Sequence, residues 1–222
     1  MLNNQKDMSL ASMFGRKPAS SSQSCRSEIE ALFEKVVQSA DTTDPNMLGP
    51  PHLVNLSQLL QTSEDDVAMY VIPWKLKCAT PTKISKTEWV HGFQQMRIDS
   101  LEKLRTSLPL LRNELANSGN FRDFYYFLFD WIKETPGAKY LSNDCAVSMW
   151  SLVFQPKTFP LLKDWLMFTS QISKKNVTKD LWKQTLDFSS VTQLSQYDPA
   201  GSWPTTMDEF VDWSKKRSAA KQ

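Results

Sequence analysis

Short N-capping motifs recur along this chain, and each is followed by apolar residues at helical spacing. Ser27, Ser85 and Thr206 each precede a glutamate by three positions, which is the spacing of a capping box at the start of a helix. Apolar residues then recur three and four positions apart. No stretch alternates apolar and polar residues for long enough to indicate a strand. The sequence therefore predicts an all-α protein of about nine or ten helices with short connections.

Aromatic residues supply the mass of a helical core. The chain has eight Trp, twelve Phe and five Tyr beside only six Gly, too little glycine for a turn-rich β-sandwich or barrel. Its 26 basic and 24 acidic side chains leave a net charge of +2, so we expect no nucleic-acid partner. No run approaches the roughly 18 consecutive apolar residues of a membrane-spanning helix. We expect no membrane partner either.

Residues with catalytic or metal-binding chemistry are few. The three cysteines form no C-x-x-C pair, and His52 and His91 have no metal-binding spacing. Glycine-rich phosphate-binding loops are absent from the sequence. Cys78 and Cys145 lack an activating neighbour and are predicted to be small core residues. The sequence therefore predicts no cofactor, no metal site and no catalytic residue, in a protein of a reducing compartment.

Composition divides the chain into three segments. Residues 1–24 are rich in Ser, Asn, Gln and Lys and are predicted to form a disordered N-terminal tail. Residues 25–215 carry the helical periodicity and are predicted to form the folded domain. Residues 216–222 are predicted to be a basic C-terminal tail.

One predicted helix, which begins near Ser63, has two apolar stripes instead of one. Such a helix is either fully buried or lines a groove for an apolar ligand, and the sequence leaves both alternatives open. Pro73 lies inside this helix and is expected to remove a backbone hydrogen bond and bend it. The first stripe consists of Val67, Tyr70, Val71 and Trp74, and the second of Met69, Ile72, Pro73 and Leu76.

The C-terminal quarter of the chain is acidic. Between Asp180 and Trp213 there are six acidic residues and one lysine, which is typical of a solvated helix face but also suits a basic partner. Within it, the twelve residues from Asp198 to Glu209 have the length and the terminal acids of an EF-hand loop. Trp203 stands where that loop needs glycine, so an EF-hand shape without calcium is expected. A calcium-responsive helical sensor remains an alternative.

Seven blocks of the sequence together resemble the Dcn-like family, the "defective in cullin neddylation" proteins with their potentiating-neddylation domain. The blocks keep the family's order over about residues 27 to 213. They are Pro73-Trp74-Lys75-Leu76, Ile84-Ser85-x-x-Glu88-Trp89, Asp99-Ser100-Leu101-Glu102-Lys103-Leu104, Phe121-x-x-Phe124-Tyr125, Lys179-Asp180-x-Trp182, Leu186-Asp187-Phe188-Ser189 and Tyr197-Asp198-x-x-Gly201-Ser202-Trp203-Pro204.

The resemblance implies two EF-hand-like halves without calcium ligands and a scaffold-type co-ligase without its own nucleophile. The implied partners are the C-terminal winged-helix region of a cullin and the Nα-acetylated neddylation conjugating enzyme, with the RING subunit of the ligase as a further candidate. The expected location is the nucleus and cytoplasm. An alternative is an adaptor that binds cullins without stimulating the conjugating enzyme.

The resemblance also implies two binding sites, carried over by position. The cullin-binding residues would be Asp180, Ser202 and Asp208. Ser202 stands where the family usually has Ala, and Pro73 stands where relatives commonly have Ala, next to the peptide pocket. The implied acetylated-peptide pocket consists of Leu53, Leu56, Met69, Ile72, Leu76, Ile84, Trp131 and Leu152.

Overall fold

The computed structural model describes residues 19–41, 43–154 and 158–220. Within these ranges the chain forms ten α-helices and two very short pairs of strands, so the predicted all-α class is confirmed. The helices are α1 (Ala19–Val37), α2 (Pro50–Leu59), α3 (Val67–Lys75), α4 (Lys86–Met96), α5 (Leu101–Glu114), α6 (Ser118–Trp131), α7 (Asn143–Val153), α8 (Leu162–Met167), α9 (Lys179–Phe188) and α10 (Thr205–Ala219).

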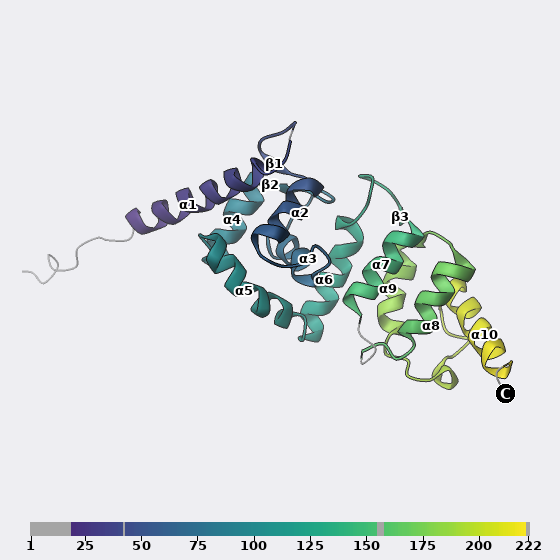
Figure 1. Cartoon of the computed structure of the whole chain (residues 1–222). Helices are drawn as coiled ribbons and strands as arrows, with labels where there is room; N and C mark the ends of the chain where they lie inside the picture. The colour runs from purple at the N-terminus through teal and green to yellow at the C-terminus, as the bar shows by residue number, and fades with distance from the viewer. Residues whose placement is uncertain (1–18, 42, 155–157, 221–222) are drawn as a thin grey trace, which may run out of the picture.

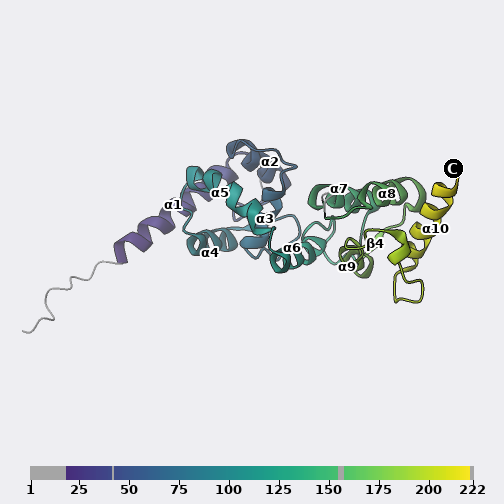
Figure 2. The same cartoon turned by 90° about the horizontal axis from the view of Figure 1, so that it is seen from below.

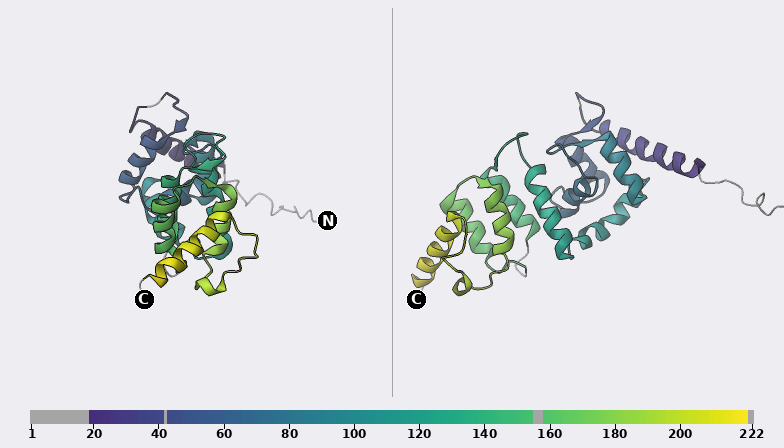
Figure 3. Two further views of the ribbon diagram at one scale, coloured as in Figure 1. Left: turned by 90° about the vertical axis from the view of Figure 1, so that its right-hand side faces the viewer. Right: turned by 180° about the vertical axis from the view of Figure 1, so that it is seen from behind.

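The helices form two groups that follow one another along an elongated molecule (Figure 1). Helices α1 to α5 make one group and α7 to α10 the other, with α6 between them, and the view from below shows the same order (Figure 2). From behind, α1 and α10 lie at opposite ends (Figure 3). A π-helical turn, η2 (Phe168–Ser173), continues α8, and a 3₁₀ turn, η3 (Leu194–Gln196), lies between α9 and α10.

Each group contains one antiparallel pair of two-residue strands. Strand β1 (Met47–Leu48) pairs with β2 (Ile84–Ser85), and β3 (Tyr140–Leu141) pairs with β4 (Val177–Thr178). Every one of these strands comes just before a helix, so each pair ties together the starts of two helices: α2 and α4 in one group, α7 and α9 in the other. The Asp198–Glu209 loop belongs to neither pair, and its last residues already lie in α10.

Two predicted boundaries differ from the structure. Helix α1 begins at Ala19, so residues 19–24 are helical and not part of a tail; residues 1–18 lie outside the described residues. Ser27 is inside α1 and donates to the carbonyl of Ser24, and Arg26 pairs with Glu30 one turn ahead (2.8 Å), an arrangement that extends the helix instead of starting it. At the other end, α10 continues to Ala219, beyond the boundary predicted at residue 215.

The cap of α4 was predicted correctly, whereas that of α3 was shifted. Ser85 accepts from the backbone N–H of Glu88, and the Glu88 carboxylate accepts from the backbone N–H of Ser85 (2.8 Å). Helix α3 begins three residues later than Ser63 suggested, because Asp66 accepts from the N–H of Ala68 and serves as its N-cap. It continues through the buried Pro73 to Lys75.

Asp66 also joins α3 to α5 through an ion pair with Arg112. The side chain of Asp66 is 12% exposed, and the Arg112 guanidinium holds its pKa down at about 2, with further hydrogen bonds from Thr62 and from the Ala68 N–H. Because folding lowers this pKa below the ordinary 3.8, the ion pair stabilises the fold above about pH 4, and the stabilisation is lost as the pH falls toward 2.

The change Asp66→Asn tests this ion pair without removing the cap, since Asn caps helices as well as Asp does. We expect the free energy of unfolding to fall by about 1–2 kcal/mol at pH 7, a value reduced because Arg112 is partly exposed. Urea unfolding between pH 7 and pH 2 measures it, and the difference from the parent should shrink as the pH falls below about 4 toward 2. Asp65→Asn, next along the chain, is the control. An equal effect of both changes at pH 7 would contradict a stabilising role for the ion pair between Asp66 and Arg112.

A hydrogen-bonded aromatic cluster joins α6, α7 and α9. The hydroxyl of the fully buried Tyr125 donates to the carbonyl of Trp182 (2.9 Å) and accepts from the indole Nε1 of Trp150 (2.9 Å). The indole Nε1 of Trp182 donates to the carbonyl of Tyr125 (2.8 Å), and the two rings stack with centroids 4.5 Å apart. Every polar atom these three side chains bring into the core therefore has a partner.

Helix α4 approaches the end of α3 very closely at Gly92. A Cβ atom placed on this glycine would lie 2.4 Å from Cδ2 and 3.0 Å from Cα of Leu76, so no larger residue fits without displacement. Leu76 is itself buried, as are Trp89 and Phe93 on the same face of α4. The glycine is thus required by helix packing and not by a turn.

Candidate functional site

The three residues expected to bind a cullin lie on α9, on α10 and in the loop between them. Asp180 is exposed in the first turn of α9, and Ser202 is exposed shortly before α10. Asp208 is half-buried in the first turns of α10. Their role stays a prediction, since position alone does not show binding.

Aromatic residues hold the loop that carries Ser202. The Tyr197 ring stacks against Trp203 with centroids 5.8 Å apart, and Trp203 meets Phe188 at the end of α9 edge to face, also at 5.8 Å. The Tyr197 hydroxyl donates to the Asp208 carboxylate. Burial, followed by this carboxylate, raises the pKa of Tyr197 well above its ordinary value, so the phenol stays protonated and donates at neutral pH. The side chain of Asp208 is thereby oriented.

Close packing explains why the Gly-Ser-Trp-Pro block begins with glycine, at Gly201. A Cβ atom at this position would lie 2.8 Å from Nε1 and 2.9 Å from Cδ1 of Trp203. A side chain here would push the indole away from Tyr197 and Phe188. The small residue therefore allows the loop to close over its own tryptophan and present Ser202 outward.

The acidic residues around this surface differ in their pairing. Glu209 binds Lys175 (2.7 Å), and Asp187 binds Arg122 (3.3 Å), so both are compensated by lysine or arginine. Asp180 forms no ion pair with any described residue. An exposed carboxylate that is unpaired within the folded chain is available to a basic partner. The Lys175–Glu209 pair also fixes the segment before α9 to α10, the two helices that carry the acidic residues.

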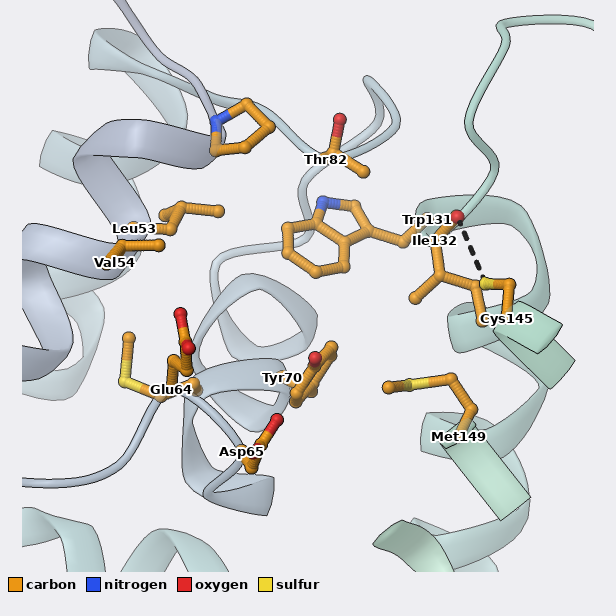
Figure 4. Close-up of a pocket in the computed structure, with 12 residues that line it drawn as sticks. Leu53, Val54, Glu64, Asp65, Tyr70, Thr82, Trp131, Ile132, Cys145 and Met149 are labelled. Carbon is orange, nitrogen blue, oxygen red and sulfur yellow. Dashed lines mark hydrogen bonds between the residues drawn. The ribbon is translucent and has the colours of Figure 1, made fainter. Parts of the chain in front are cut away.

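A mostly apolar cavity of about 310 Å³ opens between the two groups of helices (Figure 4). Its walls come from α2, α3, the end of α6 and α7, with contributions from the connections after α2 and α3. A volume in this range holds a small ligand or a short peptide end. The lining residues are Pro50, Leu53, Val54, Glu64, Asp65, Met69, Tyr70, Thr82, Trp131, Ile132, Cys145 and Met149.

The cavity contains only part of the pocket expected from the resemblance. Leu53, Met69 and Trp131 line it. Four other expected residues are core residues with at most 3% exposure: Leu56, Ile72, Leu76 and Ile84. Ile72 and Leu76 belong to the second stripe of the α3 segment, which therefore faces mainly inward. Leu152 lines a separate cavity beside Arg112 and Phe121. Both alternatives for α3 thus hold in part: it is largely buried, and one edge of it lines a cavity.

Several lining residues were not anticipated. Tyr70 belongs to the first stripe of α3, yet it lines the cavity and meets the Trp131 ring edge to face at 6.1 Å. Glu64 and Asp65 lie in the connection before α3, where helical periodicity gives no information. Met149 comes from α7, about 80 positions away in sequence.

Burial raises the pKa of two of the cysteine thiols, Cys145 at the cavity and Cys78 in the core. Burial raises the pKa of Cys145 to about 11, so its thiol is protonated and a weak nucleophile at neutral pH. Cys78 is buried, and burial raises its pKa further. No group of three or more potential metal-ligating side chains occurs in the described parts of the chain. Likewise, none of the described helices has both the length and the apolar character needed to cross a membrane.

Comparison with known proteins decides the family. The "Cullin binding" family model matches residues 103–213, which includes α6, α9 and the Asp180–Asp208 region. DCN1-like protein 5 of Homo sapiens is 30% identical over 176 residues, covering 78% of this chain and 73% of the relative. The chain belongs to the DCN1-like, cullin-binding family. This membership supports a role in cullin neddylation.

Other DCN1-like relatives match over a similar part of the chain. DCN1-like protein 4 of Danio rerio is 33% identical over 174 residues, covering 78% of this chain and 61% of that protein. DCN1-like protein 3 of Drosophila melanogaster is 29% identical over 180 residues, covering 80% of this chain and 54% of that protein. The resemblance inferred from the seven sequence blocks is therefore confirmed at the level of the family.

Proposed function

We propose that this DCN1-like chain is a scaffold-type co-ligase for cullin neddylation. The α9–α10 surface with Asp180, Ser202 and Asp208 binds the C-terminal winged-helix region of a cullin. The apolar cavity binds the Nα-acetylated N-terminus of the neddylation conjugating enzyme. The chain promotes transfer of the ubiquitin-like modifier to the cullin, in the nucleus and cytoplasm, and the RING subunit of the ligase is a further partner in this proposal.

The observation that carries the proposal is the apolar cavity between α2, α3, α6 and α7, in a chain whose family binds cullins. An acetylated N-terminus has no ammonium charge and enters apolar surroundings without the cost of several kcal/mol of burying an unpaired charge. A free amine is disfavoured at the same position by desolvation. The cavity therefore suits a neutral, apolar peptide end.

Acceleration in this proposal comes from proximity. Holding the conjugating enzyme and the cullin on one molecule raises their effective concentration and restricts their orientation, which lowers the barrier without an acid, a base or a metal.

The experiment that tests the proposal measures the rate of cullin neddylation in a purified system, with and without this chain. Each arm is run with acetylated and with unacetylated conjugating enzyme. We expect acceleration with the acetylated enzyme and its loss with the unacetylated one. If the chain binds the cullin and gives no acceleration with either, it is an adaptor, and the co-ligase proposal is overturned.

Charge reversal tests the cullin-binding surface. We expect Asp180→Lys to weaken cullin binding at least about tenfold, because it replaces an unpaired exposed carboxylate with a like charge against a basic partner. Titration by fluorescence anisotropy or calorimetry measures the affinity, and the helical circular dichroism signal should not change. Glu102→Lys on α5, in the other group of helices, reverses another exposed charge and is the control. Unchanged affinity of the Asp180 variant would remove α9 from the interface.

A further inference from the structure

The apolar cavity has an acidic side that the apolar part of the proposed ligand leaves unused. Glu64 and Asp65 line it from the connection between α2 and α3, and both are exposed. Neither carboxylate forms an ion pair with a described residue; the neighbouring Asp66 takes Arg112 instead. In Figure 4 Asp65 lies beside Tyr70 and Glu64 lies below Val54, both at the side of the cavity opposite Thr82. Two uncompensated negative charges thus border an apolar cavity.

The opposite side of the cavity holds a buried donor without an acceptor. Trp131 is 5% exposed, and its indole Nε1 has no hydrogen-bond partner among the described residues. Figure 4 shows this nitrogen turned toward Thr82, which also lines the cavity. A buried N–H without an acceptor costs free energy that a ligand carbonyl recovers. The cavity therefore presents a donor on one side and two carboxylates on the other.

This arrangement identifies a complementary ligand. We propose that the cavity is selective for acylated peptides that carry a basic side chain within their first few residues, with the cation held by Glu64 and Asp65 and an acyl or peptide carbonyl accepting from Trp131 Nε1. The inference rests on the proposed function, since it concerns the peptide bound at the same cavity. It adds a preference for a basic side chain to a site in which apolar packing alone would not select for the charge of the peptide.

The positions of the two polar sides favour a peptide over a small apolar molecule. An apolar molecule would fill the space between Leu53, Met69 and Met149 and leave both the indole N–H and the carboxylates without partners. A chain that enters acyl end first brings carbonyls inward and its following side chains to the mouth. The exposed carboxylates then act at the rim, where charge mainly sets the association rate and selectivity.

The experiment titrates short acetylated peptides that begin with Met and differ only in having Lys or Gln at one of the next four positions. We expect Glu64→Gln combined with Asp65→Asn to weaken binding of the best Lys peptide by about threefold to tenfold at low salt, and by less at high salt. Binding of the Gln peptide should not change. Glu102→Gln combined with Asp123→Asn removes the same charge elsewhere and should have no effect.

A second variant tests the donor side. Trp131→Phe keeps a ring but removes the N–H, and we expect about threefold to tenfold weaker binding of the acetylated Lys peptide, with no loss for an analogue whose N-terminal acyl-amide is replaced by hydrocarbon. If Lys and Gln peptides bind the parent equally, the charge selectivity is overturned while the proposed function stands. If no acetylated peptide binds the parent at all, the proposed function itself fails.

Discussion

Replacing Tyr125 with Phe is expected to lower the free energy of unfolding by about 2–4 kcal/mol. The change removes one oxygen and no ring, so the core keeps almost the same volume. It nevertheless leaves the indole N–H of Trp150 without an acceptor and the Trp182 carbonyl without this donor, in a region closed to water. Unpartnered polar groups in such surroundings carry their full desolvation cost.

Urea unfolding followed by tryptophan fluorescence measures the effect, because two of the affected residues are themselves tryptophans. The adjacent Tyr126→Phe is the control, since its hydroxyl only accepts from Arg122 at the surface (3.2 Å) and its loss should cost less than about 0.5 kcal/mol. Equal and small effects of the two changes would show that the buried hydroxyl contributes little to the stability of this core.

Replacing Gly92 with Val is expected to lower the free energy of unfolding by a similar amount, about 2–4 kcal/mol. Here the reason is that the added side chain has no room. The Cδ2 atom of Leu76 can turn aside, but its Cα belongs to the backbone that follows α3 and lies only 3.0 Å from the new Cβ. The clash with this Cα is removed only if α4 moves away from α3, which opens the core around Trp89 and Phe93.

Thermal and urea unfolding measure the loss, and Gly49→Val is the matched control. Gly49 has an extended backbone and no atom within 4 Å of a Cβ placed on it, so valine there should cost no more than about 1 kcal/mol. A Gly92 variant as stable as the Gly49 variant would mean that the two helices separate freely, and that their close approach is not required.

The sequence predicted the helices well because their signals are local. The Ser85–Glu88 capping box was identified from spacing alone, and the structure has both of its hydrogen bonds. The same pattern at Ser27 was misleading, since a Ser-x-x-Glu sequence also fits the middle of a helix when neighbouring turns are stabilised by an ion pair such as Arg26–Glu30. Spacing identifies a cap only where the chain before it cannot continue the helix.

The candidate cavity was harder to predict because it is formed by segments that are distant in sequence. Periodicity showed that Met69 and Ile72 share a stripe of α3, but only packing decides that Met69 lines the cavity and Ile72 is buried in the core. Tyr70 belongs to the other stripe and nevertheless lines the cavity together with Met69. Family resemblance supplied Leu53 and Trp131 by position, and it gave no information about Glu64 and Asp65, which lie outside every motif that carried it.

Helix α6 belongs to both groups of helices at once. Its last residue, Trp131, lines the cavity beside α3, while Tyr125 and Phe129 pack on Trp182 of α9, the helix that carries Asp180. Fourteen helical residues extend about 21 Å. The two proposed sites therefore share one stiff element, and thermodynamic linkage applies to them. If a peptide that shifts α6 from the cavity changes the affinity of the α9 surface for its partner by some factor, then that partner changes the affinity of the cavity for the peptide by the same factor.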